Sequence, residues 1–271
     1  MPTGNRHGPL LSPNINCAVQ LAFLGTGTSQ GVPVIACTCA VCLSNDPRDK
    51  RTRTSVLVEV NGTRLLIDAG PDLRQQMLRE GISDLDAVLL THEHMDHIAG
   101  LDDTRAFSFV HEPARDIPIY ANPATLEAVK RVYSYAFKTS RYPGVPRFSM
   151  HPVGDSPFMI ADVEVRPVEV MHLHMPVLGF RIGGLTYLTD AKTIAASEKQ
   201  KMLGSRVLVV NALRRKEHIS HFNLEEALAL IGELAPERAY LTHISHLMGT
   251  HASVHLPANV ALAYDGLKVD L

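Results

Sequence analysis

The segment LDAVLLTHEHMDH (85–97) constrains the fold more than any other part of the chain. Its apolar run is typical of a buried strand, and it ends in His92, His94, Asp96 and His97. A single histidine is more often a hydrogen-bonded surface or core residue. Four ionisable groups within six residues have no apolar role, so the segment predicts a chemical site at a strand end.

Other candidate ligands also follow apolar runs. Asp68 follows "TRLLI", His172 lies in "VEVMH", Asp190 follows "LTYLT", and His243 follows "RAYLT". Loops at strand ends are where a rigid sheet brings distant side chains together. Imidazole and carboxylate groups suit zinc, manganese or iron, and a set of this size suits two ions.

The cysteines form a second cluster. Cys37, Cys39 and Cys42 give C-x-C-x-x-C, and Cys17 lies outside it without an assigned role. Disulfide scaffolds spread cysteines along short secreted chains, whereas a tight cluster in a long chain with 14 histidines favours a metal site.

The remaining pattern indicates strands with interspersed helices, which predicts a layered α/β domain. Asn61-Gly62 and Asp265-Gly266 each predict a hairpin turn between two short strands. Helices are expected over 71–80, 123–138 and 224–234. We expect residues 1–18 to form a flexible leader and 19–271 a single domain.

Composition excludes several classes of protein. A net charge of −2 gives no general attraction for nucleic acid, and no extended nucleic-acid surface is evident. No apolar stretch approaches the roughly 20 residues of a membrane helix, and the N-terminus does not have the pattern of a signal peptide. We therefore expect a cytoplasmic protein that does not contact membranes.

These motifs resemble those of the metallo-β-lactamase fold superfamily, whose hallmark is H-x-H-x-D-H after a buried strand and an aspartate after an earlier one. The resemblance covers residues 21–271. It implies a four-layer αββα sandwich with a dinuclear site at one edge. One ion would be held by His92, His94 and His243. The other would be held by Asp96, His97 and a histidine of "MHLH", with Asp190 as the bridge and Asp68 as an orienting residue.

"MHLHMPVLGF" offers both His172 and His174, which would face the same side of a strand. We prefer His172 as the ligand, because in related proteins the ligand histidine lies about this far before the glycine-aromatic pair, here Gly179-Phe180. His174 would then lie at the rim and could contact substrate.

A narrower resemblance is to the PhnP-type phosphodiesterases, on "GTGTSQGVP", the cysteine cluster and "LTHISH". It implies a structural zinc held by Cys37, Cys39, Cys42 and His246. It also implies hydrolysis of a small, cyclic phosphodiester by a hydroxide held between two manganese or zinc ions.

Within this resemblance, His221 matches the family's histidine before the "FNL" helix start, and we assign it as the general acid. His218 is the weaker alternative for that role. Arg214 is a candidate ligand for a non-scissile phosphate, although a surface arginine is the commoner case.

Rival interpretations stay open. A transfer-RNA 3′-processing endoribonuclease shares the metal motifs but would need a glycine-rich, basic arm, which 101–165 does not show. A quinone-cofactor biosynthesis protein of the PqqB type ranks next, and a non-catalytic metal-binding scaffold has no need of a candidate acid.

The stretch 131–148 suits either a pocket rim or a homodimer face. The expected partner is a small phosphodiester or nucleotide-like substrate.

Overall fold

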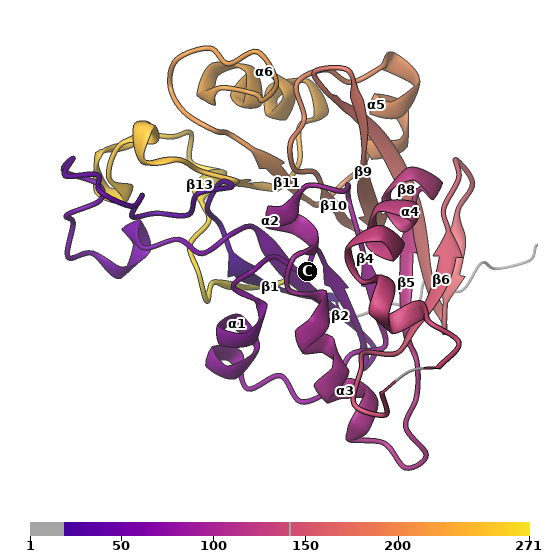
Figure 1. Ribbon diagram of the computed structural model, residues 1–271. Coiled ribbons are helices and arrows are strands. Elements are labelled where there is room, and N and C mark those ends of the chain that lie inside the picture. Colours follow the sequence, from indigo (N-terminus) through magenta and orange to yellow (C-terminus); the bar gives the residue numbers. More distant parts are fainter. Residues whose placement is uncertain (1–18, 141) are drawn as a thin grey trace, which may run out of the picture.

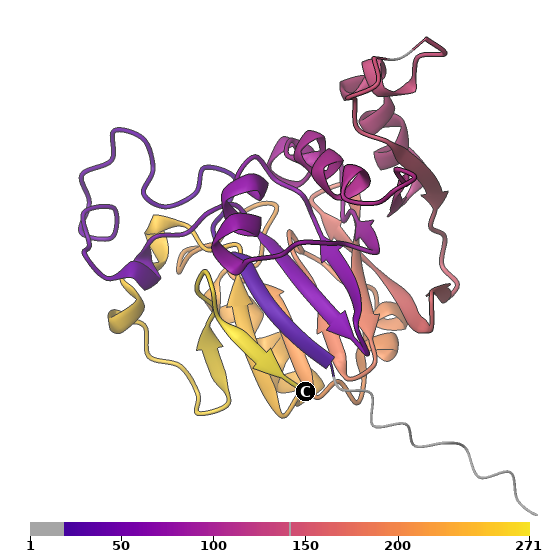
Figure 2. The same ribbon diagram turned by 90° about the horizontal axis from the view of Figure 1, so that it is seen from below.

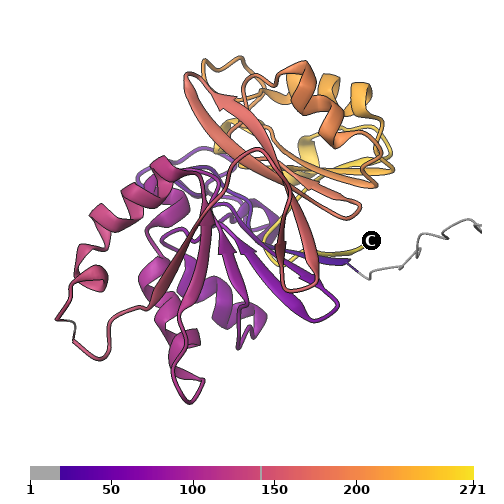
Figure 3. The same cartoon turned by 90° about the vertical axis from the view of Figure 1, so that its right-hand side faces the viewer.

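The computed structural model describes residues 19–140 and 142–271, and it consists of two β-sheets packed face to face (Figure 3). The expected leader 1–18, with Cys17, lies outside the described residues. In order across the first sheet, the strands are β14 (Lys268–Asp270), β1 (Val19–Gly25), β2 (Ser55–Val60), β3 (Thr63–Ile67), β4 (Ala87–Leu89), β5 (Ile117–Ala121) and β6 (Phe148–Pro152).

The second sheet is built mainly from the later half of the chain. In order, its strands are β13 (Val260–Leu262), β12 (Arg238–Thr242), β11 (Val207–Asn211), β10 (Leu185–Tyr187), β9 (Met175–Ile182), β8 (Val163–His172) and β7 (Phe158–Ile160). Both sheets are mixed. The pairs β3–β4, β4–β5 and β5–β6 in the first sheet run parallel, as do β10–β11, β11–β12 and β12–β13 in the second.

Helices cover the outer faces of the two sheets (Figures 1 and 2). The α-helices are α1 (Leu73–Glu80), α2 (Met95–Ile98), α3 (Arg105–Phe109), α4 (Pro123–Val132), α5 (Ala196–Met202) and α6 (Leu224–Leu234). Short 3₁₀ helices span Pro47–Asp49, Leu101–Thr104, Ser134–Phe137, His246–Met248 and His251–Ser253. Side chains of α1, α3 and α4 pack on the first sheet, and those of α5 and α6 pack on the second. The result is the expected αββα arrangement.

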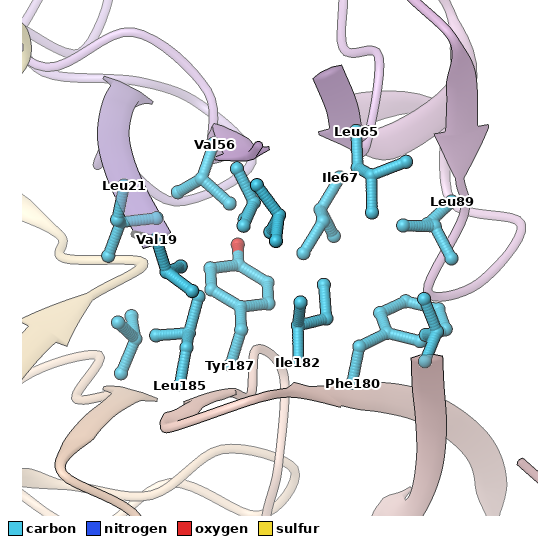
Figure 4. Close-up of a cluster of buried hydrophobic side chains, with 14 of the residues drawn as sticks. Val19, Leu21, Val56, Leu65, Ile67, Leu89, Phe180, Ile182, Leu185 and Tyr187 are labelled. Atoms are coloured by element: carbon cyan, nitrogen blue, oxygen red, sulfur yellow. The ribbon is translucent and has the colours of Figure 1, made fainter. Parts of the chain in front are cut away.

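The strand β1 shows why its sequence is apolar at nearly every position. Leu21 and Phe23 point into the core between the two sheets, whereas Ala22 and Leu24 point toward the helices outside. A strand covered on both faces has no solvent side, so it reads as a continuous apolar run instead of an alternating one. Figure 4 shows the inter-sheet core, in which Tyr187 of β10 lies opposite Val56 and Ile67.

One of the two expected hairpin turns needs correction. Asp265-Gly266 does not close a hairpin, because β13 pairs with β12 in the second sheet and β14 pairs with β1 in the first. The turn instead carries the chain from one sheet to the other. The Asn61-Gly62 hairpin is confirmed, since β2 and β3 pair in antiparallel register around it.

The helix expected over 123–138 ends early. The α-helix stops at Val132, and a 3₁₀ helix follows from Ser134 to Phe137. Among the described residues, no helix has the length and apolar character that crossing a membrane requires.

Candidate metal centre

Loops that leave both sheets bring their ionisable side chains to one place. Asp68 follows β3, the 92–97 cluster follows β4 and enters α2, His172 ends β8, and His243 follows β12. Here the ionisable residues form three groups, and within each group the candidate ligand atoms lie within 4.8 Å of one another. The groups are His92, His97 and Asp190; Asp96, His97 and His243; and His172, Asp190 and His221. The expected strand-end residues therefore converge, and Asp190 lies in two of the three groups.

A buried hydrogen-bond network fixes two of the histidine rings. The Asp68 carboxylate accepts hydrogen bonds from Thr91 N (2.8 Å), Thr91 Oγ1 (2.9 Å) and His97 Nδ1 (2.7 Å). Because the Thr91 hydroxyl donates to Asp68, it accepts from His92 Nδ1 at 2.9 Å. Both rings thus carry their hydrogen on Nδ1 and present the lone pair of Nε2 to the centre, as metal-binding histidines do.

The ring of His172 is held in the same way from the second sheet. Its Nδ1 lies 2.9 Å from the carbonyl oxygen of Ser220 and 3.1 Å from that of Asp190. A carbonyl can only accept, so Nδ1 carries the hydrogen and Nε2 is left free to bind a metal.

The free nitrogen atoms test whether a metal fits this site. His92 Nε2, His97 Nε2 and His243 Nε2 are buried without a hydrogen-bond partner, a costly state for polar atoms in the absence of a ligand. His97 Nε2 lies 3.3 Å from Asp190 Oδ2 and His243 Nε2 lies 3.3 Å from Asp190 Oδ1. Two ligands about 2.0–2.1 Å from one tetrahedral ion lie about 3.4 Å apart. The donor set and its spacing therefore fit a divalent transition metal.

The geometry favours a division of the ligands between the two ions that differs from the one expected. The His172 ring centroid lies 5.3 Å from that of His94 and 6.0 Å from that of His92, whereas His243 groups with Asp96 and His97. We therefore propose His92, His94 and His172 as one ligand set and Asp96, His97 and His243 as the other. The order of motifs along a chain cannot show which strand end faces which across the sandwich.

Charges around Asp190 favour its ionised form. Burial alone would raise the pKa of this carboxyl, but His243 and His97 beside it hold the pKa well below its usual range. At His221 burial is the largest effect, and it lowers the pKa of the ring to about 4 against the opposing hydrogen bond with Asp190.

Three of these residues adopt a left-handed backbone. Asp68, Asp190 and His243 have φ values of 64°, 55° and 54°. A residue other than glycine costs roughly 1–2 kcal/mol in this conformation, and such strain tends to gather at functional sites. Each of the three residues lies just after the end of a strand, where the chain turns into the loops that form the site.

The other candidate site residues lie beside the proposed metal ligands, at what we call the mouth of the site. His221 Nε2 is 3.0 Å from Asp190 Oδ1, and its Nδ1 is 3.2 Å from His218 Nδ1. His221 is therefore close enough to serve as a metal ligand as well as a proton donor. Arg214 already donates to the carbonyl oxygens of Lys216 and Glu217.

His174 does not share a strand face with His172. The strand β8 ends at His172, and Leu173 and His174 form the exposed turn that leads into β9. The turn separates the two histidines, so His172 enters the cluster and His174 lies exposed beside it. Sequence reasoning missed Thr91 and the backbone of Ser220, because a threonine or a carbonyl carries no signal of its role in orienting a histidine.

The cysteine cluster forms a separate site. His246 Nδ1 lies 3.2 Å from Cys37 Sγ, 3.5 Å from Cys39 Sγ and 3.5 Å from Cys42 Sγ, and the three thiols are free. With Zn–S about 2.3 Å and Zn–N about 2.0 Å, a tetrahedral zinc places sulfur and nitrogen about 3.5 Å apart. The four residues therefore fit a closed tetrahedral site.

Comparison with known proteins agrees with this geometry. Residues 63–244 match a family model described as a beta-lactamase superfamily domain. A crystal structure of a diphosphatase from the PhnP family shares 39% sequence identity, with a TM-score of 0.87 over 93% of this chain and 98% of that one. Zn²⁺-bound PqqB from Methylobacterium extorquens has a TM-score of 0.73 at 21% identity, covering 93% of this chain and 100% of that one, which shows a shared fold.

Curated relatives match over part of their length. An octanoyltransferase of Porphyromonas gingivalis is 44% identical over 255 residues, which is 91% of this chain and 50% of that protein. Coenzyme PQQ synthesis protein B of Methylorubrum populi is 37% identical over 41% of this chain and 40% of its own. Ribonuclease Z of Bradyrhizobium diazoefficiens is 33% identical over 45% of this chain and 36% of its own. The chain thus spans half or less of the length of these relatives.

Proposed function

The chain is a hydrolase of the metallo-β-lactamase superfamily and belongs to its PhnP family, and we propose that it hydrolyses small phosphodiesters in a metal-dependent reaction. The observation that carries the proposal is the convergence of three buried, unpartnered Nε2 atoms on the carboxylates of Asp96 and Asp190. Two divalent cations held there would polarise a phosphoryl oxygen and provide a nucleophile near neutral pH.

The residues of this chain divide the remaining work. Asp68 and Thr91 hold the rings of His92 and His97 in one tautomer and one orientation. The carboxylate of Asp190, which groups with His92 and His97 and also with His172 and His221, would bridge the two ions.

His221 is the proposed proton donor to the leaving group. Its ring lies at the mouth, with 12% of the side chain exposed, beside Asp190 and His218. Its low pKa keeps the ring neutral in the substrate-free site, and the negative charge of a bound phosphodiester would favour protonation.

The mouth suits a small substrate better than a long polyanion. Met95, Leu173 and Ile219 follow His94, His172 and His218, and their exposed fractions are 54%, 47% and 73%. RNA binding depends on cations that contact successive phosphates. The apolar rim and the hydrogen bonds that already engage Nε and Nη2 of Arg214 therefore rank an endoribonuclease below a small-molecule phosphodiesterase, and the PqqB-like alternative stays behind both.

The substrate bond is either a cyclic phosphodiester or a diphosphate linkage. The resemblance to PhnP-type enzymes favours the first, and the description of the PhnP-family structure as a diphosphatase favours the second. In both linkages the phosphorus atom is bonded to an oxygen that can leave, so the same pair of metal ions could act on either. We rank the cyclic phosphodiester first.

The octanoyltransferase name of the Porphyromonas gingivalis relative is at odds with this proposal. The chain aligns with half of that protein, so the name can describe the half that has no counterpart here. The name is therefore no reason to assign acyl transfer to this chain, and the metal-ligand set also argues against that reaction.

We assign the Cys37, Cys39, Cys42 and His246 site to a structural zinc, because a closed set of three thiolates and one imidazole leaves no position for substrate.

A substrate panel tests the proposed function. Wild-type protein loaded with manganese or zinc should hydrolyse bis(p-nitrophenyl) phosphate. The class of its natural substrate is then identified by comparing kcat/KM for a ribose cyclic phosphate with kcat/KM for a dinucleoside diphosphate. Asp190→Asn should lose this activity, whereas Asp116→Asn, a surface change at a residue paired with Arg147, should keep it. Octanoyl transfer from a thioester without phosphodiester hydrolysis would contradict the proposal.

A further inference from the structure

A second, basic pocket lies apart from the metal centre. It is formed by the loop 30–33, the segment 47–53, α1 and Asp265, and its volume is about 400 Å³. This volume falls in the range of small-molecule sites, about 300–1,000 Å³. Its wall carries the cationic residues Lys50, Arg51, Arg53 and Arg79 and the carboxylates Asp72 and Asp265.

Arg51 is the most unusual group in this wall. The residue is 4% exposed, and its Nη1 donates to Thr26 Oγ1 at 2.8 Å and to the carbonyl oxygen of Ala263. Among the described ranges 19–140 and 142–271, no carboxylate lies within ion-pair distance of it, although Asp265 and Asp49 offset part of its charge from further away. Burial lowers the pKa of Arg51 to about 10, so the guanidinium stays charged at neutral pH. A buried charge without a counter-charge in direct contact is costly.

The neighbouring cations have also left donors unused. Arg53 binds Asp72 through Nη1 at 3.1 Å, but its Nε is buried without a partner. Arg79 pairs with Glu80 at 2.9 Å and lies 3.6 Å from Asp265. The two carboxylates of the wall are therefore engaged by Arg53 and Arg79, and Asp265 acts on the charge of Arg51 from beyond ion-pair distance.

We propose that this pocket binds a small phosphate-bearing anion, at a site separate from the metal centre. Guanidinium forks match the several oxygens of a phosphoryl group better than any single-oxygen ligand does. Such an anion would place a negative charge among the four cationic residues of the wall, which outnumber its two carboxylates.

The pocket backs onto two segments that carry proposed metal ligands. Gly27 forms bridges with Arg53 on one side and with Ile244, the neighbour of His243, on the other. At Gly70 an added Cβ would lie 2.2 Å from Asp96 O and 3.3 Å from Arg53 Cβ. A bound anion would thus stabilise backbone that is in contact with both segments.

Equilibrium dialysis of the metal-loaded protein tests the site. Inorganic phosphate should bind the wild type at the metal centre and at a second site. Arg51→Met and Arg53→Gln should each weaken the second site at least tenfold. Arg206→Gln, which alters an exposed pair with Glu237, should leave both sites unchanged. Arg53→Gln carries the test if Arg51→Met does not fold.

A parallel dialysis with adenosine monophosphate distinguishes the two possible ligands, a phosphate ester and free inorganic phosphate. Arginine-dependent binding of the nucleotide identifies a phosphate ester as the ligand, and arginine-dependent binding of phosphate alone identifies the free anion. The inference is overturned if both anions bind equally to the wild type and to both arginine variants. Because the readout is binding and not turnover, that outcome leaves the proposed phosphodiesterase activity untouched.

Discussion

Asp68→Asn isolates the hydrogen bonds that orient the metal ligands. The carboxylate accepts three hydrogens, from the Thr91 amide, the Thr91 hydroxyl and His97 Nδ1. An asparagine has one acceptor oxygen, so its amide group must face at least one of these donors. Asparagine is among the residues that best tolerate the left-handed φ of 64° at this position. The change therefore removes a hydrogen bond without adding backbone strain.

The expected loss follows from the burial of this network. A buried donor left without an acceptor costs about 1–3 kcal/mol, and roughly 1.4 kcal/mol corresponds to a tenfold change. If this cost falls on the metal-loaded state, affinity at the Asp96, His97 and His243 set drops by about 5- to 150-fold. That range agrees with the roughly 10- to 100-fold effect of residues that support metal ligands.

Competition against a chromophoric chelator measures this affinity, with zinc and with manganese. Asp116→Asn makes the same chemical change at the surface and should match the wild type. The reasoning is refuted if Asp68→Asn binds both metals as tightly as the wild type and keeps its kcat/KM.

Three further predictions concern single residues. His221→Ala should keep its metals and lose about 10²–10⁴-fold in rate for alkoxide leaving groups, with a smaller loss for p-nitrophenolate; loss of a metal equivalent would make it a ligand instead. His172→Ala should lose one equivalent of catalytic metal and His174→Ala none, and elemental analysis giving the reverse pattern would exchange their roles. Cys39→Ser should lower Tm and zinc content, whereas an unchanged melting curve and zinc content would rule out a structural zinc.

The sequence predicted the layers and the residues of the site because both depend on local patterns. Apolar runs mark the strands, and His92, His94, Asp96 and His97 follow one of them directly. The fold class and the family are confirmed. The assignment of roles within the site stays a prediction.

What the sequence could not give depends on contacts between distant segments. The grouping of His172 with His94 depends on how the sheets face each other. The turn at Asp265-Gly266 looks like a hairpin locally, but it connects different sheets. The basic pocket likewise unites Arg51 with Arg79 of α1, which no local pattern connects.

Metal dependence of phosphodiester hydrolysis tests the central claim most directly. The protein would be dialysed against a chelator until elemental analysis shows the catalytic metals removed, and hydrolysis of bis(p-nitrophenyl) phosphate would be followed before and after manganese or zinc is added back. We expect turnover to fall to the buffer rate and to return with two equivalents of metal. Undiminished turnover by the protein without catalytic metals would contradict the proposal.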